Sequence, residues 1–508
     1  RRDTSTARAT VYRPASDPRP VTASAMVVSA DGSQLYVVQP ESNTVLSLDP
    51  ATREVSRWPV CDTPRSVALT AGRLAVACEG DDTLLLLSSS DGTEQERWML
   101  GAGCQPVSVV GRDRTFYAAC SGTGEIWEAF DDDPPKRIRT GLEDPRGLGL
   151  RADGTLVTTR FRGNEGWHDR FGEPLGGGLV TVGDDRITLA PDPGPDSDTA
   201  NRGTPNLLAA LALSPSDDVA YIGATVANLD RGLTADGRSL DFENSLRATV
   251  RYVDLVAGEE DLGLRALPDN HGTVGALALS PRGTWLWVAL QNTNTIQRLD
   301  AFSLQSSDAI LNAGDGVDAL AVSPDGSTLY VHAWLSREVR AYDISSSLAS
   351  EPPLRWSVPT VETEPLSAEV LQGKILFHSA IDPRMARDGY LSCASCHPFG
   401  TADGLTWDFT HRGEGMRNTI WLTGHGGTEQ GPVHWTGNFD EIHDFEGDIR
   451  NGQGGRGLLT DADWRATSDS LGPAKAGRSA ALDALAAYVT SLDAFPPSPF
   501  AAPEGGRE

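Results

Sequence analysis

The sequence predicts an all-β seven-bladed propeller followed by a small all-α domain. Three observations support this prediction. A strand–turn–strand phrase recurs up to residue 343, the pattern then gives way to a Pro-rich segment, and apolar residues beyond that segment follow helical spacing. The predicted parts are an N-terminal extension (1–19), the propeller (20–358), a linker (359–366), the helical domain (367–497) and a C-terminal tail (498–508).

The repeated phrase is clearest in "VVSADGSQLYVVQPESNTVLSLD" (27–49), "LALSPRGTWLWVALQNTNTIQRLD" (277–300) and "LAVSPDGSTLYVHAWLSREVRAYD" (320–343). Fainter copies begin at residues 67, 107, 148 and 211. Each copy reads as strand, Asp-Gly-type turn, strand, polar turn and strand, which is the pattern of β-hairpins. The best-preserved copies are about 42 residues apart, the size of a four-stranded propeller blade. Seven copies therefore predict seven blades.

Blades four and five carry the insertions "FRGNEGWHDRFGEPLGGG" (161–178) and "ATVANLDRGLTADGRSLDFENSL" (224–246). Long insertions on one face of a propeller usually build a binding rim, although loops without a function would look the same. The repeat region as a whole, about 20–358, resembles the YVTN/NHL-type seven-bladed propellers of bacterial exported proteins. That resemblance implies a fold but no particular activity.

Four of the six cysteines occupy matched positions in two successive repeats. Cys61 and Cys78 are 17 residues apart, and Cys104 and Cys120 are 16 apart. Each pair would bracket one antiparallel hairpin, so we expect the disulfides Cys61–Cys78 and Cys104–Cys120 rather than links between blades. Four buried free thiols are the alternative. Disulfides would indicate an oxidising compartment.

The formal net charge of −27 argues against nucleic-acid binding, which requires a basic surface. An acidic surface favours cationic partners, although it can also serve solubility alone. No apolar run is long enough to span a membrane, so no transmembrane segment is expected. The chain starts with "RRDTSTARAT", which resembles a mature or trimmed end rather than a signal peptide.

Beyond the linker, "SAEVLQGKILFHSA" (367–380) begins with a Ser at a predicted N-cap and has apolar residues at helical spacing. Near the end, "SAALDALAAYVTSLDAF" (479–495) places four apolar residues on one stripe. Gly-rich loops with few strand signals lie between these two segments. A small helical domain wrapped around a bound group is the interpretation that fits this pattern.

The pentad "CASCH" (393–397) is typical of covalent attachment of haem c. The thiols of Cys393 and Cys396 would each add to one haem vinyl group from a single helical turn. His397 would then ligate the iron through a ring nitrogen. A zinc half-site would need two further ligands, and a thioredoxin-like redox pair would need a βαβ setting, so both alternatives are weaker.

The flanks of the pentad strengthen this interpretation through a resemblance. Segment 365–495 is similar to the cytochrome c fold, in which the first and last helices cross. In particular, "SCASCHPFGTADGL", "GEGMRNTIWL" and "HWTGNFDEI" resemble the N-terminal haem domain of di-haem cytochrome c peroxidases. The resemblance implies haem-binding roles for Arg417 and Trp435. The family has two CxxCH motifs and this chain has one, which puts peroxidase activity in doubt.

The second axial side of the iron has several candidates. We expect His434, which precedes the Trp-x-Gly turn that the resemblance places near the distal side, and Pro432 would stiffen its approach. His411, Met416, His425 and an open site are the alternatives. Glu441 would act as a general acid for peroxide if the distal site is open.

A carboxylate-rich segment follows the Trp-x-Gly turn. It contains Asp440, Glu441, Asp444, Glu446 and Asp448. Such a segment can hold Ca²⁺. The favoured interpretation is that these carboxylates lie near helix N-termini, where negative charge stabilises a helix.

These features together predict an exported mono-haem c-type cytochrome, periplasmic or at the cell surface. It would transfer electrons to or from a redox partner protein that docks near the junction of propeller and haem domain. One alternative is a haem peroxidase-like or oxidase enzyme. The other is a ligand-binding propeller with a structural haem.

Overall fold

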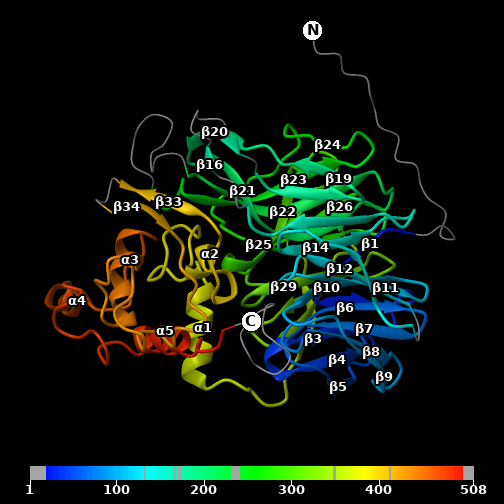
Figure 1. Cartoon of the computed structure of the whole chain (residues 1–508), viewed down its shortest axis with the longest axis horizontal. Helices are drawn as coiled ribbons and strands as arrows, with labels where there is room; N and C mark the ends of the chain where they lie inside the picture. Colours follow the sequence, from blue (N-terminus) through cyan, green and yellow to red (C-terminus); the bar gives the residue numbers. More distant parts are fainter. Residues whose placement is uncertain are drawn as a thin grey trace, which may run out of the picture.

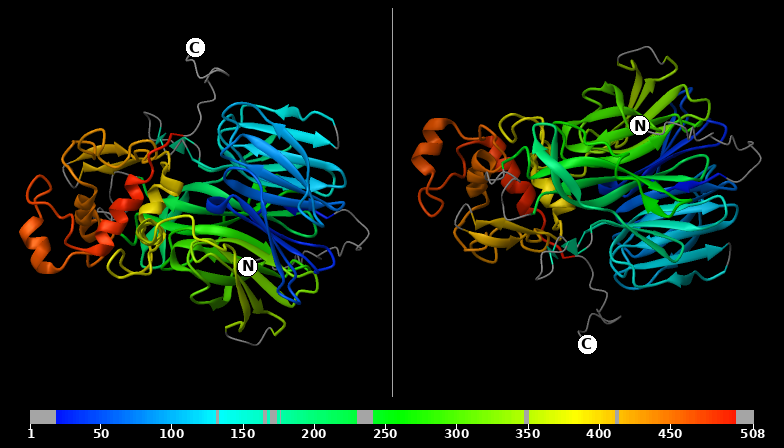
Figure 2. Two further views of the ribbon diagram at one scale, coloured as in Figure 1. Left: turned by 90° about the horizontal axis from the view of Figure 1, so that it is seen from below. Right: turned by 90° about the horizontal axis from the view of Figure 1, so that it is seen from above.

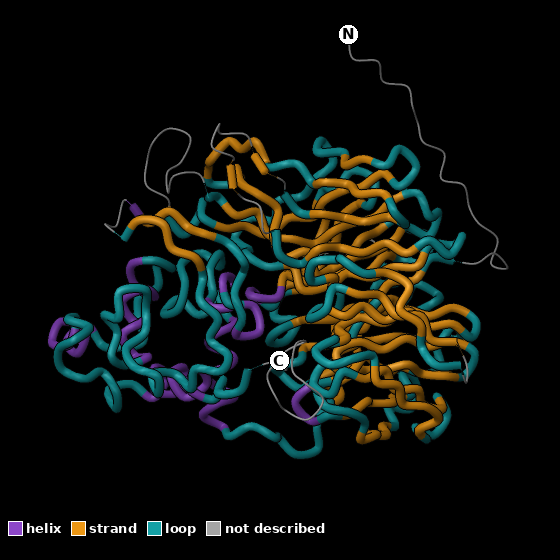
Figure 3. The backbone as a smooth tube through the Cα atoms, in the orientation of Figure 1, coloured by secondary structure: helices purple, strands orange, loops and turns teal. Residues whose placement is uncertain are grey.

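The computed structural model describes residues 19–130, 133–163, 167–168, 174–175, 177–229, 241–346, 351–410 and 414–495. Most strands gather in one body, and a part built from short helices and loops lies against one side of it (Figures 1 and 3). Two further views show the same arrangement (Figure 2). None of the helices in the described ranges has the length and hydrophobic character needed to cross a membrane.

Seven antiparallel sheets, which follow one another along the chain, confirm the predicted seven-bladed propeller. The first three blades are β2 (Met26–Val28), β3 (Leu35–Gln39), β4 (Thr44–Leu48) and β5 (Val55–Pro59); β6 (Pro64–Thr70), β7 (Arg73–Cys78), β8 (Thr83–Ser88) and β9 (Glu94–Met99); and β10 (Pro106–Arg112), β11 (Thr115–Cys120), β12 (Glu125–Phe130) and β13 (Lys136–Arg139). Short 3₁₀ turns link strands in blades 1 and 6, at η1 (Pro40–Ser42) and η2 (Gln291–Thr293).

Blades 4 and 5 are the irregular ones, as the insertions in their sequences predicted. The remaining blades are β14 (Pro145–Leu150), β15 (Leu156–Arg160), β18 (Leu179–Val182) and β19 (Asp185–Thr188); β20 (Asp192–Ser197), β21 (Ala200–Leu213), β22 (Val219–Ala227), β23 (Leu246–Asp254) and β24 (Glu259–Glu260); β25 (Val274–Leu279), β26 (Trp285–Leu290), β27 (Thr295–Asp300) and β28 (Ser306–Ile310); and β29 (Val317–Val322), β30 (Thr328–Ala333), β31 (Glu338–Asp343) and β32 (Leu354–Pro359). Strand β1 (Val21–Thr22) pairs with β14, and the insertion of blade 4 forms a separate pair, β16 (Trp167–His168) and β17 (Pro174–Leu175).

The second strands of the blades, such as β3 and β7, are buried along nearly their whole length, whereas the outermost ones, such as β9 and β13, are largely exposed. The ring closes by packing between blades. Met26 and Leu46 of blade 1 belong to one core cluster with Tyr330 and Val339 of blade 7. The Asp-Gly turns recur in the same geometry: Asp31 accepts a hydrogen bond from the Ser33 amide at 3.1 Å, and Gly32 follows it at φ 75°.

Both predicted disulfides are confirmed. Cys61 is bonded to Cys78, and Cys104 to Cys120. In each pair, the first cysteine precedes the inner strand of a blade and the second ends the next strand. Each bond therefore closes one hairpin and links no two blades.

The C-terminal part contains five short helices, a hairpin and two 3₁₀ turns in the described residues. They are α1 (Ala368–His378), α2 (Cys393–Cys396), η3 (Pro398–Gly400), β33 (Thr406–Phe409), β34 (Gly415–Asn418), η5 (Ile442–Phe445), α3 (Glu446–Asn451), α4 (Asp461–Thr467) and α5 (Ala480–Thr490). The prediction of a distinct all-α domain is therefore not confirmed: the two end helices are present, but the hairpin and long loops fill the space between them.

Helices α1 and α5 cross at close range. A Cβ atom on Gly373 would lie 1.9 Å from the Ala484 carbonyl oxygen, so only glycine permits this approach. Phe377 and Tyr488 pack edge to face at the crossing, with ring centroids 5.1 Å apart. This pair of helices forms the centre of the core of the C-terminal part.

A buried charge cluster joins the two parts of the chain. Arg337 of blade 7 donates to both carboxylate oxygens of Glu364 at 2.9 Å, and to Glu41 of blade 1 at 2.9 Å. Lys374 of α1 pairs with the same Glu41 and lies 4.6 Å from the ring centroid of Trp334. Burial opposes ionisation of Glu41, but Lys374 and Arg337 outweigh it and lower its pKa to about 2.

We expect the two disulfides to stabilise the propeller independently. Replacing Cys104 and Cys120 together by Ala should lower the free energy of unfolding by about 3 kcal/mol, because a loop of this length gains that much entropy when released. Urea unfolding followed by circular dichroism measures the change, with Cys61→Ala plus Cys78→Ala as the matched comparison. Unchanged midpoints in both would contradict the pairing.

Stability should fall in acid because of Glu41. Its pKa is lowered from 4.5 to about 2, so its contribution is complete above pH 4.5 and is lost as the pH falls towards 2. Glu41→Gln should cost on the order of 3 kcal/mol at pH 7 and flatten this part of the pH profile. Glu125→Gln, which breaks an ion pair within blade 3, is the control. Equal losses in both variants would refute a special role for the cluster.

Candidate functional site

The pentad forms α2 and the residue after it. Ser392 caps the helix: its amide donates to the Ser395 hydroxyl at 3.0 Å, and both serines are buried. Cys393 and Cys396 start and end the single turn, and neither is in a disulfide. His397 follows as the C-cap, and its amide donates to the Cys393 carbonyl at 2.9 Å. Two free thiols and one imidazole thus project from one short helix.

The two thiols lie in different surroundings. Cys393 packs against the core cluster of α1 and α5, and the Gln453 amide donates to its sulfur at 3.7 Å. Cys396 packs with Leu405 and Trp407 and with residues of blade 5. Burial raises the pKa of Cys393 to about 11, and burial followed by the charge of Asp403 raises the pKa of Cys396 well above its ordinary value. Both sulfurs are therefore held as neutral thiols.

The imidazole of His397 is fixed by the backbone. Its Nδ1 lies 3.1 Å from the Thr401 carbonyl oxygen, so Nδ1 carries the proton and donates. The lone pair is left on Nε2, the nitrogen suited to bind iron. Burial lowers the pKa of His397 to about 4, although the carbonyls of Thr401 and Ile420 oppose this effect, so the ring is neutral near pH 7.

Propeller side chains hold the loop after His397. Arg162 Nε donates to the Ala402 carbonyl at 2.7 Å, and its Nη2 donates to the Thr401 hydroxyl at 3.0 Å. The Asn206 amide donates to the Asp403 carbonyl at 3.1 Å. The carboxylate of Asp403 accepts from the Leu405 amide and the Trp407 indole, and burial raises its pKa to about 6. This loop is therefore shared between the two parts of the chain.

Trp435 contacts the strand that carries Arg417, the other residue for which the resemblance implies a haem-binding role. The Trp435 indole donates to the Asn418 carbonyl at 2.7 Å, which places the Trp-x-Gly turn beside Arg417. Arg417 Nη1 donates to the Met416 carbonyl at 2.9 Å, but its Nε is buried and has no hydrogen-bond partner among the residues that the structure describes. A buried guanidinium nitrogen left free suits a site that receives an acidic group.

The axial candidates differ in their surroundings. His434 has a φ of +68°, its Nδ1 lies 2.9 Å from the Asn438 amide oxygen, and its ring stacks on Phe439 at 4.7 Å. Its Nε2 is 3.8 Å from a Glu414 carboxylate oxygen. Met416 is 53% exposed, His425 packs against Phe495, and His411 lies outside the described residues. The assignment of His434 as axial ligand stays a prediction.

Three of the five carboxylates of the acidic segment accept from donors within the chain. Glu441 accepts from the amides of Lys475 and Ala476 at 2.5 and 3.2 Å. Asp444 pairs with the Lys475 ammonium at 2.5 Å, and Glu446 accepts from Arg450 at 2.8 Å. The contacts of Glu441 and Asp444 join the segment to the loop that precedes α5, and the contact of Glu446 lies within α3. A general-acid role for Glu441 and a Ca²⁺ site here both stay predictions.

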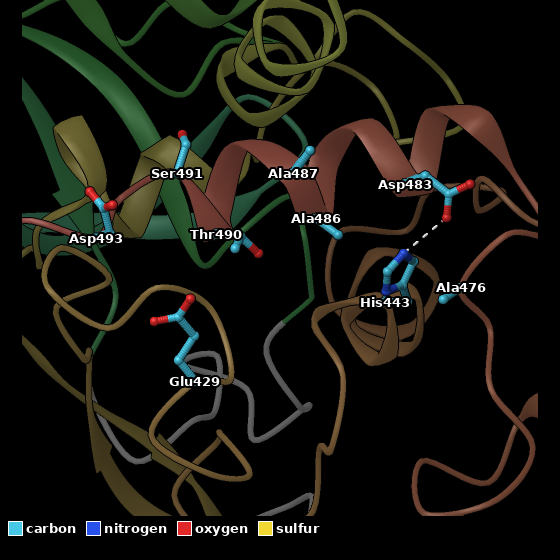
Figure 4. Close-up of a pocket in the computed structure, with 9 residues that line it drawn as sticks. All are labelled: Glu429, His443, Ala476, Asp483, Ala486, Ala487, Thr490, Ser491 and Asp493. Atoms are coloured by element: carbon cyan, nitrogen blue, oxygen red, sulfur yellow. Dashed lines mark hydrogen bonds and ion pairs between the residues drawn. The ribbon is translucent and has the colours of Figure 1, made fainter. Parts of the chain in front are cut away.

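One cavity, of about 580 Å³, lies along α5 and does not contain the pentad. It is lined by Glu429, Asp483 and Asp493 among others (Figure 4). His443 occupies one end and contacts Asp483 at 3.0 Å. A second cavity, of about 200 Å³, lies where all seven blades meet the segment from Ser392 to Phe399. The chemistry of thiols and imidazole, rather than cavity size, identifies the site.

Several residues around the pentad escaped the sequence reasoning. Gln453 and Asp403, which contact the two thiols, belong to no pattern that the sequence displays. Arg162 lies in the insertion of blade 4, which the sequence did flag as a binding rim, although its contact is with the C-terminal part of the same chain.

No model of a known protein family matches the chain, and no curated protein does. Solved structures resemble it in fold. A chain of Kuenenia stuttgartiensis hydrazine synthase aligns with a TM-score of 0.51 at 17% identity, covering 66% of this chain and 98% of its own length. Dihydro-heme d1 dehydrogenase NirN in complex with DHE aligns at a TM-score of 0.40 and 16% identity, covering 66% and 65%. The first of these likenesses supports the propeller fold and says nothing of activity.

Before any group is attached, the thiols should react slowly with iodoacetamide. At pH 8, a thiol with a pKa of about 11 carries about a hundredfold less thiolate than one at the ordinary 9.0. Alkylation of Cys393 in the folded, haem-free chain, followed by peptide mass spectrometry, should be slower by that factor than in the urea-unfolded chain. Equal rates would show that the thiol is not buried.

Proposed function

We propose that the chain is an exported mono-haem c-type cytochrome that transfers electrons. The observation that carries this proposal is the arrangement at the pentad: two free thiols on one helical turn, next to an imidazole whose Nδ1 is committed to the Thr401 carbonyl. This is the donor set that a covalently attached haem requires. The close crossing of α1 and α5, and the unpartnered Arg417 nitrogen, add support.

Each residue has a defined role in the proposed site. Cys393 and Cys396 would hold the haem through thioether bonds, and His397 Nε2 would face the iron. Haem, when bound, supplies the one-electron chemistry. The hydrogen bond from Nδ1 to the Thr401 carbonyl orients the ring, and Arg417 offers a donor to an acidic group of the cofactor. Core residues around Cys393 exclude water from this side.

The propeller would act as a docking platform for the redox partner. The net charge of −27 favours a partner with a cationic surface. Two disulfides in the propeller support an oxidising location outside the cytoplasm, either periplasmic or at the cell surface.

The direct test is haem stoichiometry. Expressed with a haem-attachment system, the chain should carry one covalent haem, measured by intact mass after denaturation and by the optical spectrum of the reduced protein. Cys393→Ala plus Cys396→Ala should carry none, while Cys61→Ala plus Cys78→Ala should retain it. Finding no haem, or two, in the unaltered chain would reject the proposal.

The distal ligand is tested separately with His434→Ala. If His434 binds iron, the oxidised spectrum should change from low-spin to high-spin, as followed by EPR. His443→Ala is the matched control, because His443 contacts Asp483 and is no axial candidate. A low-spin spectrum in the first variant would transfer the assignment to Met416 or His411.

A further inference from the structure

We infer that Arg162, a residue of the propeller, is a positioning residue for the axial ligand His397. This inference rests on the proposed function, since it concerns how the site holds its iron ligand. It also changes the role of the propeller, which would form part of the haem environment in addition to offering a docking surface.

The first step is a chain of short contacts. His397 Nδ1 donates to the Thr401 carbonyl at 3.1 Å. The hydroxyl of the same Thr401 accepts from Arg162 Nη2 at 3.0 Å, and the next carbonyl, of Ala402, accepts from Arg162 Nε at 2.7 Å. One guanidinium therefore donates hydrogen bonds to both Thr401 and Ala402, the two residues joined by the peptide bond whose carbonyl orients the imidazole.

The second step is the fixed position of the guanidinium itself. Arg162 pairs with Asp144, and the two side chains are only 15% and 13% exposed. Its central carbon lies 5.4 Å from the ring centroid of Phe161 and 5.2 Å from that of Trp421. A planar guanidinium that is held between two aromatic rings and a carboxylate keeps its N–H groups pointing in fixed directions. A lysine ammonium, on a flexible chain with rotating donors, would not.

The third step is that the loop needs an external restraint. Between His397 and Thr401, Phe399 and Gly400 have φ values of +54° and +76°. A phenylalanine in this left-handed region is unfavourable by itself and persists only where the surroundings impose it. The bond from the Thr401 hydroxyl to the Pro398 carbonyl, at 2.6 Å, is internal to the turn, whereas the bonds from Arg162 link Thr401 and Ala402 to the propeller.

The consequence concerns the iron ligand. A histidine that donates its second nitrogen to a fixed carbonyl is held in orientation and is a stronger electron donor. Loosening that carbonyl weakens the donation and favours reduced iron, so the reduction potential should rise.

The experiment compares Arg162→Met with Arg337→Met. Arg337 also joins the propeller to the C-terminal part, through Glu364 and Glu41, but contacts no residue of the pentad loop. At a fixed ambient potential, the ratio of reduced to oxidised haem should rise about tenfold in Arg162→Met, equivalent to about 59 mV for one electron. It should change less than twofold in Arg337→Met.

Two further variants separate charge from position. Arg162→Met combined with Asp144→Asn removes the ion pair without changing net charge, and should give the same rise. Arg162→Lys should recover part of the original value. If the methionine variants fail to fold, Thr401→Val, which removes the hydroxyl that accepts from Arg162 and donates to the Pro398 carbonyl, should shift the ratio in the same direction. The inference would be overturned if both Arg162→Met and Thr401→Val changed the ratio of reduced to oxidised haem by less than twofold.

A second readout needs no haem. In the Cys393→Ala, Cys396→Ala chain, adding Arg162→Met should speed hydrogen exchange in a peptide covering 398–405 at least tenfold, while a peptide from α5 is unchanged. Equal exchange in this peptide would overturn the inference even where haem is attached. If the unaltered chain carried no haem, the proposed function would be rejected. The exchange result would then show only whether Arg162 holds the loop after His397 in place.

Discussion

The placement of α2 depends on one buried side chain of the propeller, Asn292. Its amide nitrogen donates to the carbonyls of Gly389 and Tyr390 at 3.1 Å, and its own carbonyl accepts from the Ala380 amide at 2.7 Å. Asn292 is 2% exposed, so each of these polar groups would be unsatisfied if the segment moved away. The chain between α1 and α2 is thereby held against blade 6.

Glycines allow this contact to be made between backbones. A Cβ on Gly272 would lie 1.9 Å from the Tyr390 carbonyl oxygen, and one on Gly389 would lie 2.4 Å from that of Asn270. The side chain of Tyr390 also contacts the propeller, because its hydroxyl donates to the Asp269 carboxylate at 2.7 Å. The propeller, as well as the helices of the C-terminal part, thus determines the position of the pentad.

The sequence predicted what depends on local pattern. Blade number, both disulfides and the two end helices follow from periodicity and spacing, which operate within a few tens of residues. The sequence did not predict the hairpin β33–β34, because its strands have only four residues each. Arg162 and Ala402 are 240 residues apart, and no spacing rule reports which side chains of a propeller rim will meet a later segment. The position of His434 before the Trp-x-Gly turn was enough to propose it as an axial ligand, but a position in a motif does not show which way the imidazole ring points.

The confinement of each disulfide to one hairpin has a consequence for biogenesis. Cys61 and Cys104 meet partners only 17 and 16 residues further on, so their oxidation is complete once a single blade has formed. The remaining two thiols emerge last and lie in another part of the molecule, with pKa values that disfavour the reactive thiolate. The order of the cysteines along the chain therefore separates the four that form disulfides from the two that stay reduced. A wrong disulfide between the two groups would require that a blade had not yet folded when Cys393 and Cys396 were synthesised.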